Sequence, residues 1–189
     1  MIFRPLAIPE VIEIRPSRIA DARGFFSETY SREKFAEAGL RHDWVQDNHS
    51  HSALAGVLRG LHYQEPPFAQ DKLVRVVRGS IFDVAADIRE GSPSFGKWVS
   101  LIVSAAEWNQ ILVPKGFAHG FLTLEAETEV VYKVSSHFRA SHDRNIRFDD
   151  PDFGIEWPAI GEFILSERDR RAPALAAVDS GFWYGETGN

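Results

Sequence analysis

Short runs of strand-forming residues, separated by turn signals and with no long helix between them, dominate the middle of this sequence. Residues 73–77 and 81–88 form two such runs on either side of Arg78-Gly79-Ser80, which is a turn signal. Further runs follow at residues 98–103, 110–113, 121–124 and 129–134. Short strands at this spacing are typical of an antiparallel sandwich or barrel. We therefore expect a mainly β fold with a few short helices.

The run at residues 81–88 has two chemically different faces. Its even-numbered positions from 82 to 88 are all apolar, whereas Asp83 and Asp87 lie on the opposite face. A strand with one apolar and one acidic face is a first indication that the interior of the sandwich is partly polar.

Helix signals are few. Ser31 is a candidate N-cap, Tyr30 and Phe35 have the spacing of a hydrophobic staple, and Gly39 can end the helix. Residues 173–177 are a candidate for a short terminal helix. We find no internal repeat, linker or low-complexity tract, so residues 1–189 are expected to form one domain.

Composition excludes several classes of protein. The chain is 44% hydrophobic and 25% charged with a formal net charge of −6, which argues against disorder and against binding to nucleic acid or an anionic membrane. It contains no cysteine, so disulfides, thiolate nucleophiles, zinc ribbons and iron–sulfur clusters are excluded. No apolar run approaches the ~18 residues of a membrane span, and no secretory signal is evident. A cytoplasmic location is therefore expected.

The seven histidines raise the question of a metal site. His49 and His51 have the spacing that places two imidazoles on one face of a strand, but their polar neighbours indicate a solvated loop. His62 is followed two residues later by Gln64 and not by a second metal ligand. We therefore predict that the protein has no catalytic metal.

Residues 56–64 place Arg59, His62 and Gln64 among apolar residues, shortly before Gln70 and Lys72. These residues fit either a solvated surface strand or a ligand site. In a flat strand Arg59 and His62 would point to opposite faces. A site that uses both side chains therefore requires a bulge or a strand end near Gly60.

Three other segments are ambiguous when each is considered alone. Residues 114–121 place His119 beside glycines, which fits either a close backbone approach to a ligand or an ordinary turn with a surface histidine. Tyr132 lies in a strand-like run, where tyrosine is more often a core residue than a catalytic one. Residues 165–169 are typical of a charged loop.

Taken together, these segments resemble one family, the dTDP-4-dehydrorhamnose 3,5-epimerases of the cupin superfamily. The resemblance covers residues 21–173, in the order in which the family's motifs occur. The matching segments are residues 21–26 with Glu28 and Tyr30, 46–50, 57–64, 70–75, 82–89, 92–96, 114–121, Tyr132 and Lys133, Asp150 and Pro151, 155–158, and 165–169.

The resemblance implies a cupin-type jelly-roll barrel and a cofactor-independent isomerase of nucleotide-sugar metabolism. Such an enzyme inverts carbons 3 and 5 of dTDP-4-dehydro-6-deoxy-D-glucose, giving dTDP-4-dehydro-L-rhamnose. Both carbons flank a ketone, so a base, an acid on the opposite face and a cation near the enolate oxygen are sufficient for the reaction. The product is commonly used to make the rhamnose of lipopolysaccharide or cell-wall polysaccharide.

By motif position, the resemblance assigns His62 as the base, Asp169 as its carboxylate partner, Tyr132 as the acid and Lys72 as the cation. It implies that substrate is bound by Arg23, Glu28, Gln46, Asn48, Arg59, His119, His137, Asp143 and Arg168. It also implies a homodimer in which the partner's N-terminal segment helps to build the site.

The sequence departs from the family pattern at a few positions. Ile19 stands where an aromatic residue is common, and His137-Phe138 replaces a tyrosine pair. Asp143 and Arg168 stand where Glu and Lys are usual. An altered pocket could release the sugar after one inversion. A mono-epimerase, which inverts only carbon 3 or carbon 5, is therefore an alternative. More distant alternatives are a metal-dependent cupin enzyme and a non-catalytic sugar-binding cupin.

Overall fold

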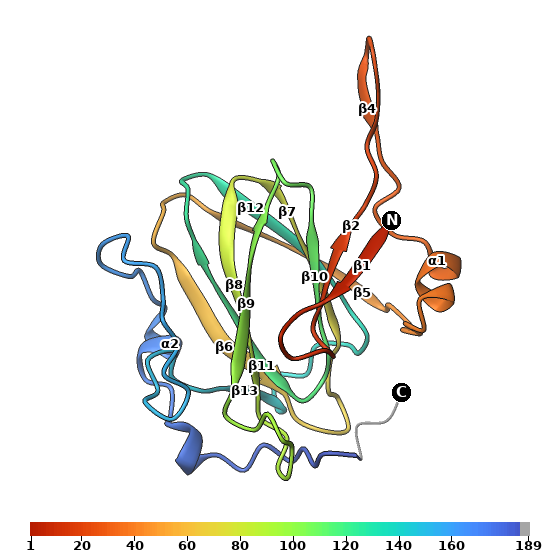
Figure 1. The fold of residues 1–189 in the computed structure, drawn as a ribbon. Helices are drawn as coiled ribbons and strands as arrows, with labels where there is room; N and C mark the ends of the chain where they lie inside the picture. The colour runs from red at the N-terminus through yellow and green to blue at the C-terminus, as the bar shows by residue number, and fades with distance from the viewer. Residues whose placement is uncertain (186–189) are drawn as a thin grey trace.

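The computed structural model describes residues 1–185, and two antiparallel sheets facing each other form most of it (Figure 1). The first sheet has the strand order β1 (Ile2–Pro5), β2 (Ile12–Arg15), β10 (Gln110–Val113), β7 (Lys72–Arg78), β12 (Thr128–Val134) and β5 (Gln46–Ser52). The second has the order β13 (Asp143–Asn145), β6 (Leu58–Gln64), β11 (Phe117–Thr123), β8 (Ser80–Asp87) and β9 (Trp98–Ser104). From β5 to β13 the chain changes sheet at every step except β8 to β9. This is the jelly-roll arrangement, and it confirms the predicted mainly β fold.

The main core lies where side chains of the two sheets meet. Val74 and Val130 from the first sheet pack in one buried cluster with Ile81, Ala85 and Phe121 from the second. Burial of such aliphatic and aromatic side chains stabilises the fold by roughly 1.5–3 kcal/mol for each residue that is fully removed from water.

Strand β8 has the two faces that its sequence predicts. Asp83 is fully buried on the face that it shares with Ile81 and Ala85, so the interior is partly polar, as expected. The even-numbered face instead packs against the C-terminal segment: Val84 lies in a second buried cluster with Phe153. The apolar face of β8 is therefore on the outside of the sandwich, where the C-terminal segment covers it.

Helix α1 (Arg32–Glu37) confirms the predicted start and stop signals. The Oγ atom of Ser31 accepts a hydrogen bond from the backbone N–H of Lys34, and the rings of Tyr30 and Phe35 lie 4.9 Å apart. Gly39 follows the helix with a φ of +81°, a conformation that glycine adopts without strain.

The predicted charged loop at residues 165–169 is wrong, because this segment contains a helical turn, α2 (Glu167–Arg170). Ser166 caps it by accepting a hydrogen bond from the backbone N–H of Asp169 at 3.1 Å. A single capped turn is too short to show helical periodicity in a sequence. The expected terminal helix is present as the 3₁₀ turn η1 (Leu175–Ala177).

Strands β3 (Ile19–Asp21) and β4 (Gly24–Phe26) form a hairpin that projects away from the two sheets (Figure 1). Its large apolar side chains are exposed, with 67% of Ile19, 51% of Phe25 and 69% of Phe26 accessible to solvent. In residues 1–185, no helix has the length and apolar character needed to cross a membrane.

Candidate active site

A cavity of about 450 Å³ lies between the sheets and brings together seven of the residues predicted from the sequence. These are Arg59, His62, Lys72, His119, Tyr132, Arg168 and Asp169. They come from β6, β7, β11, β12 and α2, so the fold collects them from positions spread over more than half of the chain. The volume is within the usual range for small-molecule sites, which is about 300–1,000 Å³.

A bulge in β6 allows Arg59 and His62 to face this cavity together. His62 pairs with His119 of β11 and Arg59 pairs with Phe121, so three steps along β6 match two along β11. Gly60 lies inside the bulge with a φ of +131°, and a Cβ atom there would approach the Cα atom of Gly120 to 2.5 Å. The predicted irregularity at Gly60 is confirmed, and close contact between the two strands explains why glycine occupies it.

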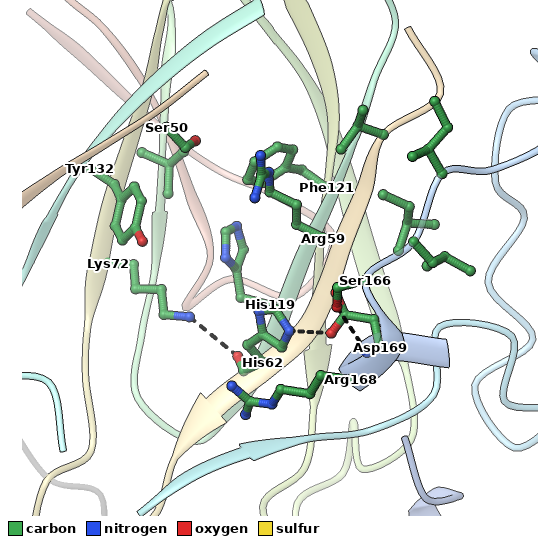
Figure 2. Close-up of a pocket in the computed structure, with 15 residues that line it drawn as sticks. Ser50, Arg59, His62, Lys72, His119, Phe121, Tyr132, Ser166, Arg168 and Asp169 are labelled. Carbon is green, nitrogen blue, oxygen red and sulfur yellow. Dashed lines mark hydrogen bonds and ion pairs between the residues drawn. The ribbon is translucent and has the colours of Figure 1, made fainter. Parts of the chain in front are cut away.

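His62 and Asp169 form a hydrogen-bonded pair on one wall of the cavity (Figure 2). The His62 Nε2 atom lies 2.5 Å from Oδ1 of Asp169, whose side chain is 4% exposed. Burial alone would raise the pKa of Asp169, but hydrogen bonding and charge from His62, with help from Ser166, hold it below its usual value. A carboxylate can only accept, so the Nε2 atom of His62 donates, and Nδ1 of the neutral ring is left with a lone pair.

Lys72 lies at the start of β7 and is buried. Its Nζ atom donates a hydrogen bond to the backbone oxygen of His62 at 3.2 Å. Burial disfavours the ammonium ion and lowers the pKa of Lys72 to about 8, although the charges of Asp143 and Asp83 partly oppose this shift. Lys72 is therefore a desolvated cation near neutral pH, placed beside the His62–Asp169 pair.

His119 is buried in β11 and forms a second histidine–carboxylate pair, so it is not the surface histidine of an exposed turn. Its Nε2 atom lies 3.0 Å and 2.9 Å from the two carboxylate oxygens of the fully buried Asp83. Burial lowers the pKa of His119 and outweighs the opposing charge of Asp83. Asp83, which sequence reasoning left without a role, therefore orients a neutral imidazole whose Nδ1 atom can accept a hydrogen bond.

Tyr132 extends from β12 on the opposite side of the cavity from His62, with Lys72 and His119 between them (Figure 2). Burial raises the pKa of Tyr132, and the charge of Arg59 opposes this only in part. The phenol thus keeps its proton at neutral pH. The cavity therefore presents an imidazole lone pair on one wall and a phenol proton on the other.

The comparisons with known proteins agree with this geometry. Residues 5–177 match the sequence profile of the dTDP-4-dehydrorhamnose 3,5-epimerase family. A curated protein of that name from Sinorhizobium fredii is 49% identical over 188 residues, which cover 97% of this chain and 94% of the relative. This chain belongs to that family.

Two solved structures of family members extend the comparison. A dTDP-6-deoxy-D-glucose-3,5-epimerase from Legionella pneumophila, in complex with dTDP-4-keto-L-rhamnose, is 42% identical with a TM-score of 0.90, covering 94% of each chain. A 3'-monoepimerase from Streptomyces bikiniensis, in complex with dTDP-quinovose, is 36% identical with a TM-score of 0.86, covering 92% of this chain and 87% of the other. The fold of this epimerase-family chain is thus the cupin-type jelly roll.

Asp143 and Arg168, two of the departures from the usual family pattern, form an ion pair with each other. The pair joins β13 to α2, and the Nδ2 atom of Asn145 also donates to the backbone oxygen of Arg168 at 3.0 Å. One side chain is acidic and the other is basic, so the two charges balance within the pair. The two positions at which the resemblance is imperfect are therefore in direct contact, and Arg168 of this pair lines the cavity.

Arg23 and Glu28 do not line the cavity of their own chain. Arg23 lies in the projecting hairpin, where its side chain is 90% exposed and pairs with Asp21 at 2.7 Å. Glu28 pairs with Lys34 at 2.7 Å. His137, another residue predicted to bind substrate, is exposed after the end of β12.

Gln46 and Asn48 lie on β5, so the prediction of a solvated loop around His49 and His51 is wrong. The segment is an edge strand that pairs with β12, and its even-numbered side chains are more buried than its odd-numbered ones. Gln46 Nε2 donates to Asn48 Oδ1 at 2.8 Å, and Asn48 lines a neighbouring cavity to which Tyr132 also contributes.

The two imidazoles of the H-x-H motif are nevertheless exposed, as predicted. Nε2 of His49 lies 3.0 Å from Glu129, and Nε2 of His51 lies 3.3 Å from Glu127. Within residues 1–185, no three His, Asp or Glu side chains gather closely enough to hold a metal ion.

Sequence reasoning missed several residues that line the cavity. These include Ser50, Phe121, Leu165 and Ser166. Strict alternation at positions 46, 48, 50 and 52 would have indicated Ser50, and the Ser166–Asp169 spacing is that of an N-cap.

Proposed function

We propose that this protein inverts carbons 3 and 5 of dTDP-4-dehydro-6-deoxy-D-glucose, giving dTDP-4-dehydro-L-rhamnose. The observation that carries the proposal is the placement of the His62–Asp169 pair and the Tyr132 phenol on opposite walls of one cavity. Inversion beside a ketone needs a proton acceptor on one face of the sugar and a proton donor on the other. Its family relatives, which bear the name of this reaction, support the same conclusion.

His62 is the base in this proposal. Its Nδ1 lone pair takes the proton from the carbon beside the ketone, and the C–H electrons form the double bond of an enolate. Asp169 stabilises the resulting imidazolium through the 2.5 Å hydrogen bond to Nε2. General-base catalysis of this kind contributes roughly 10²–10⁴-fold in rate.

Lys72 supports the enolate, because negative charge moves to the former carbonyl oxygen. Its buried ammonium group provides preorganised positive charge at a position that is shielded from solvent. Removing one such group typically lowers kcat by about 10²–10³-fold. Tyr132 then donates its proton to the opposite face of the carbon, which completes the inversion.

The remaining residues divide between the anionic and the neutral parts of the substrate. Arg59 and Arg168 line the cavity and provide positive charge suited to a diphosphate. The neutral imidazole of His119 suits a sugar oxygen better than a phosphate, since it offers an acceptor and no charge. The ketone itself acidifies both reacting carbons, so the proposal requires no redox cofactor or metal.

We further propose that residues 1–189 act as one domain in a homodimer, and that the partner's hairpin completes each site with its copies of Arg23 and Glu28. The projecting hairpin and its exposed Ile19, Phe25 and Phe26 side chains support this proposal. Mixing the inactive variants Arg23→Ala and His62→Ala should restore activity, because a mixed dimer contains one site with both residues intact. No recovery after subunit exchange would argue against a shared site.

Deuterium uptake tests the reaction. We expect the enzyme, incubated with dTDP-4-dehydro-6-deoxy-D-glucose in deuterated water, to place deuterium at carbon 3 and carbon 5. Label at one carbon alone would favour the mono-epimerase alternative. This alternative is worth testing because the chain is also similar to the 3'-monoepimerase from Streptomyces bikiniensis. Loss of activity with a chelator, together with stoichiometric bound metal, would support a metal-dependent cupin instead.

A further inference from the structure

Ser50 has a buried hydroxyl group that no other part of the described chain uses. Its Oγ atom is shielded from solvent and has no hydrogen-bond partner within residues 1–185, yet the residue lines the cavity. Buried hydroxyls in proteins are usually paired, because an unpaired one costs about 1–3 kcal/mol. An unpaired hydroxyl in the wall of a ligand cavity therefore points to a partner that arrives with the ligand.

The neighbours of Ser50 on β5 do have partners. The Oγ atom of Ser52 lies on the same face and accepts a hydrogen bond from Nη2 of Arg59 at 3.4 Å. Gln46 and Asn48 bond to each other. Ser50 is thus the inward-facing polar residue of β5 whose hydroxyl is both buried and unpaired.

Ser50 lies close to Tyr132, the residue proposed to protonate the reacting carbons. It faces Val130 of β12, and Asn48, two residues earlier on the same face, is directly opposite Tyr132. Diagonal neighbours of this kind are about 7–8 Å apart, within reach of an aromatic side chain. Ser50 is labelled beside Tyr132 and Arg59 in Figure 2, on the wall away from Asp169.

The chemistry of the substrate limits what Ser50 can bind there. In a 4-keto-6-deoxyhexose linked to diphosphate through carbon 1, only carbons 2 and 3 carry free hydroxyl groups. Carbon 3 is a reacting carbon, and carbon 2 is its neighbour. A group beside the acid that protonates carbon 3 is therefore close to both hydroxyls.

We propose that Ser50 is a specificity-determining residue whose Oγ atom forms a hydrogen bond with a sugar hydroxyl, on carbon 2 or carbon 3, of the nucleotide-sugar substrate. The inference rests on the proposed epimerase function and adds a contact that distinguishes sugars by their hydroxyl pattern. A site that leaves its own polar group unpaired when a substrate hydroxyl is missing discriminates against the deoxy substrate.

Ser50→Ala tests the inference with three substrates: the natural nucleotide-sugar and its 2-deoxy and 3-deoxy analogues. With the natural substrate, we expect kcat/KM for deuterium exchange at carbon 5 to fall about 3- to 10-fold. Wild-type enzyme should lose a similar factor on one of the two analogues. Ser50→Ala should lose nothing further on that analogue, because the two changes remove the same contact. The analogue that shows this behaviour identifies the hydroxyl.

Thermal unfolding and dTDP affinity separate this role from a structural one. Removing an unpaired hydroxyl should leave Tm unchanged or raise it, and dTDP binding should stay within about twofold. Ser135→Ala is a matched control with the opposite expectation. The Ser135 hydroxyl exchanges two 2.8 Å hydrogen bonds with Asp71, so this variant should lose stability.

Three results would overturn the inference. The first is unchanged kcat/KM in Ser50→Ala, and the second is a loss of dTDP affinity equal to the loss of kcat/KM. The third is that, for both analogues, the loss caused by the missing hydroxyl is as large in Ser50→Ala as in the wild-type enzyme. Failure of the epimerase proposal would look different. In that case, wild-type enzyme would show no deuterium exchange at either carbon of the natural substrate.

Discussion

The Nε2 atom of His62 lies 2.5 Å from the Oδ1 atom of Asp169, although 107 residues separate the two in the chain. The bulge at Gly60 turns His62 into the cavity, and the N-cap of α2 holds Asp169 against it. One imidazole nitrogen is thereby committed to the carboxylate, and the other keeps the lone pair that the proposed base requires.

His62→Ala and Asp169→Asn should both strongly slow proton exchange while leaving nucleotide binding nearly intact. The first removes the base, and the second replaces an anion that stabilises the imidazolium with a neutral amide. We expect exchange rates to fall by about 10²–10⁴-fold in each. Deuterium incorporation measures the loss, and calorimetric titration with dTDP is the control. An Asp169→Asn enzyme with wild-type exchange would remove Asp169 from the mechanism.

Tyr132→Phe should uncouple exchange from inversion. Without the phenol proton the opposite face of the enolate has no donor, whereas His62 can still remove a proton and return one to the same face. We expect label to enter the substrate while formation of the inverted product slows by about 10²-fold or more. NMR of the sugar protons distinguishes the two outcomes. Inversion at a near wild-type rate would refute Tyr132 as the acid.

Activity should fall as the pH rises through about 8, where the buried Lys72 ammonium loses its proton. Stability should change in the opposite direction. Because the pKa of Lys72 is lower in the folded protein than its ordinary 10.5, the unfolded chain binds more protons between these two values. The free energy of unfolding therefore gains a positive contribution between pH 8 and 10.5, of order 3 kcal/mol at most.

Lys72→Met isolates that contribution from other titrating groups. The variant should lack both the activity and this part of the rise in stability. The difference between wild-type and variant urea-unfolding free energies, measured from pH 7 to 10.5, gives the effect of Lys72 directly. A constant difference across that range would contradict a lowered pKa.

Gly60→Ala should damage stability and activity together. The new Cβ atom would lie 2.5 Å from the Cα atom of Gly120, at a φ of +131°. Overpacking and backbone strain each cost about 1–3 kcal/mol, so we expect a total loss of roughly 2–6 kcal/mol in unfolding free energy.

Gly91→Ala is the matched control for this glycine. Gly91 also has a positive φ, +76°, but nothing lies within 4 Å of its added Cβ atom. It should lose only the smaller strain contribution, about 1 kcal/mol, and keep full activity. Equal losses in the two variants would show that the contact between β6 and β11 is not the reason for glycine at position 60.

Much of the fold could be predicted from local sequence patterns. The alternation at residues 81–88 indicated a strand with a polar interior face, and Ser31, Tyr30, Phe35 and Gly39 marked both ends of α1. These signals are short-range, since a side chain's face or a cap depends on neighbours within about four residues. Where such a signal was too short, as in the single turn of α2, prediction from the sequence was wrong.

The site required more than local patterns. From the residue types alone, Arg59 and His62 would lie on opposite faces of a strand unless the strand is interrupted at Gly60. The residue types also do not indicate that His119 contacts Asp83 or that Asp143 contacts Arg168. Resemblance to the family indicated the residues but not their contacts, and it gave no indication of the unpaired hydroxyl of Ser50. The sequence by itself thus determined the strands, the first helix and the candidate chemistry. Only the tertiary structure decided which groups meet, because those contacts depend on strand register and on burial between distant segments.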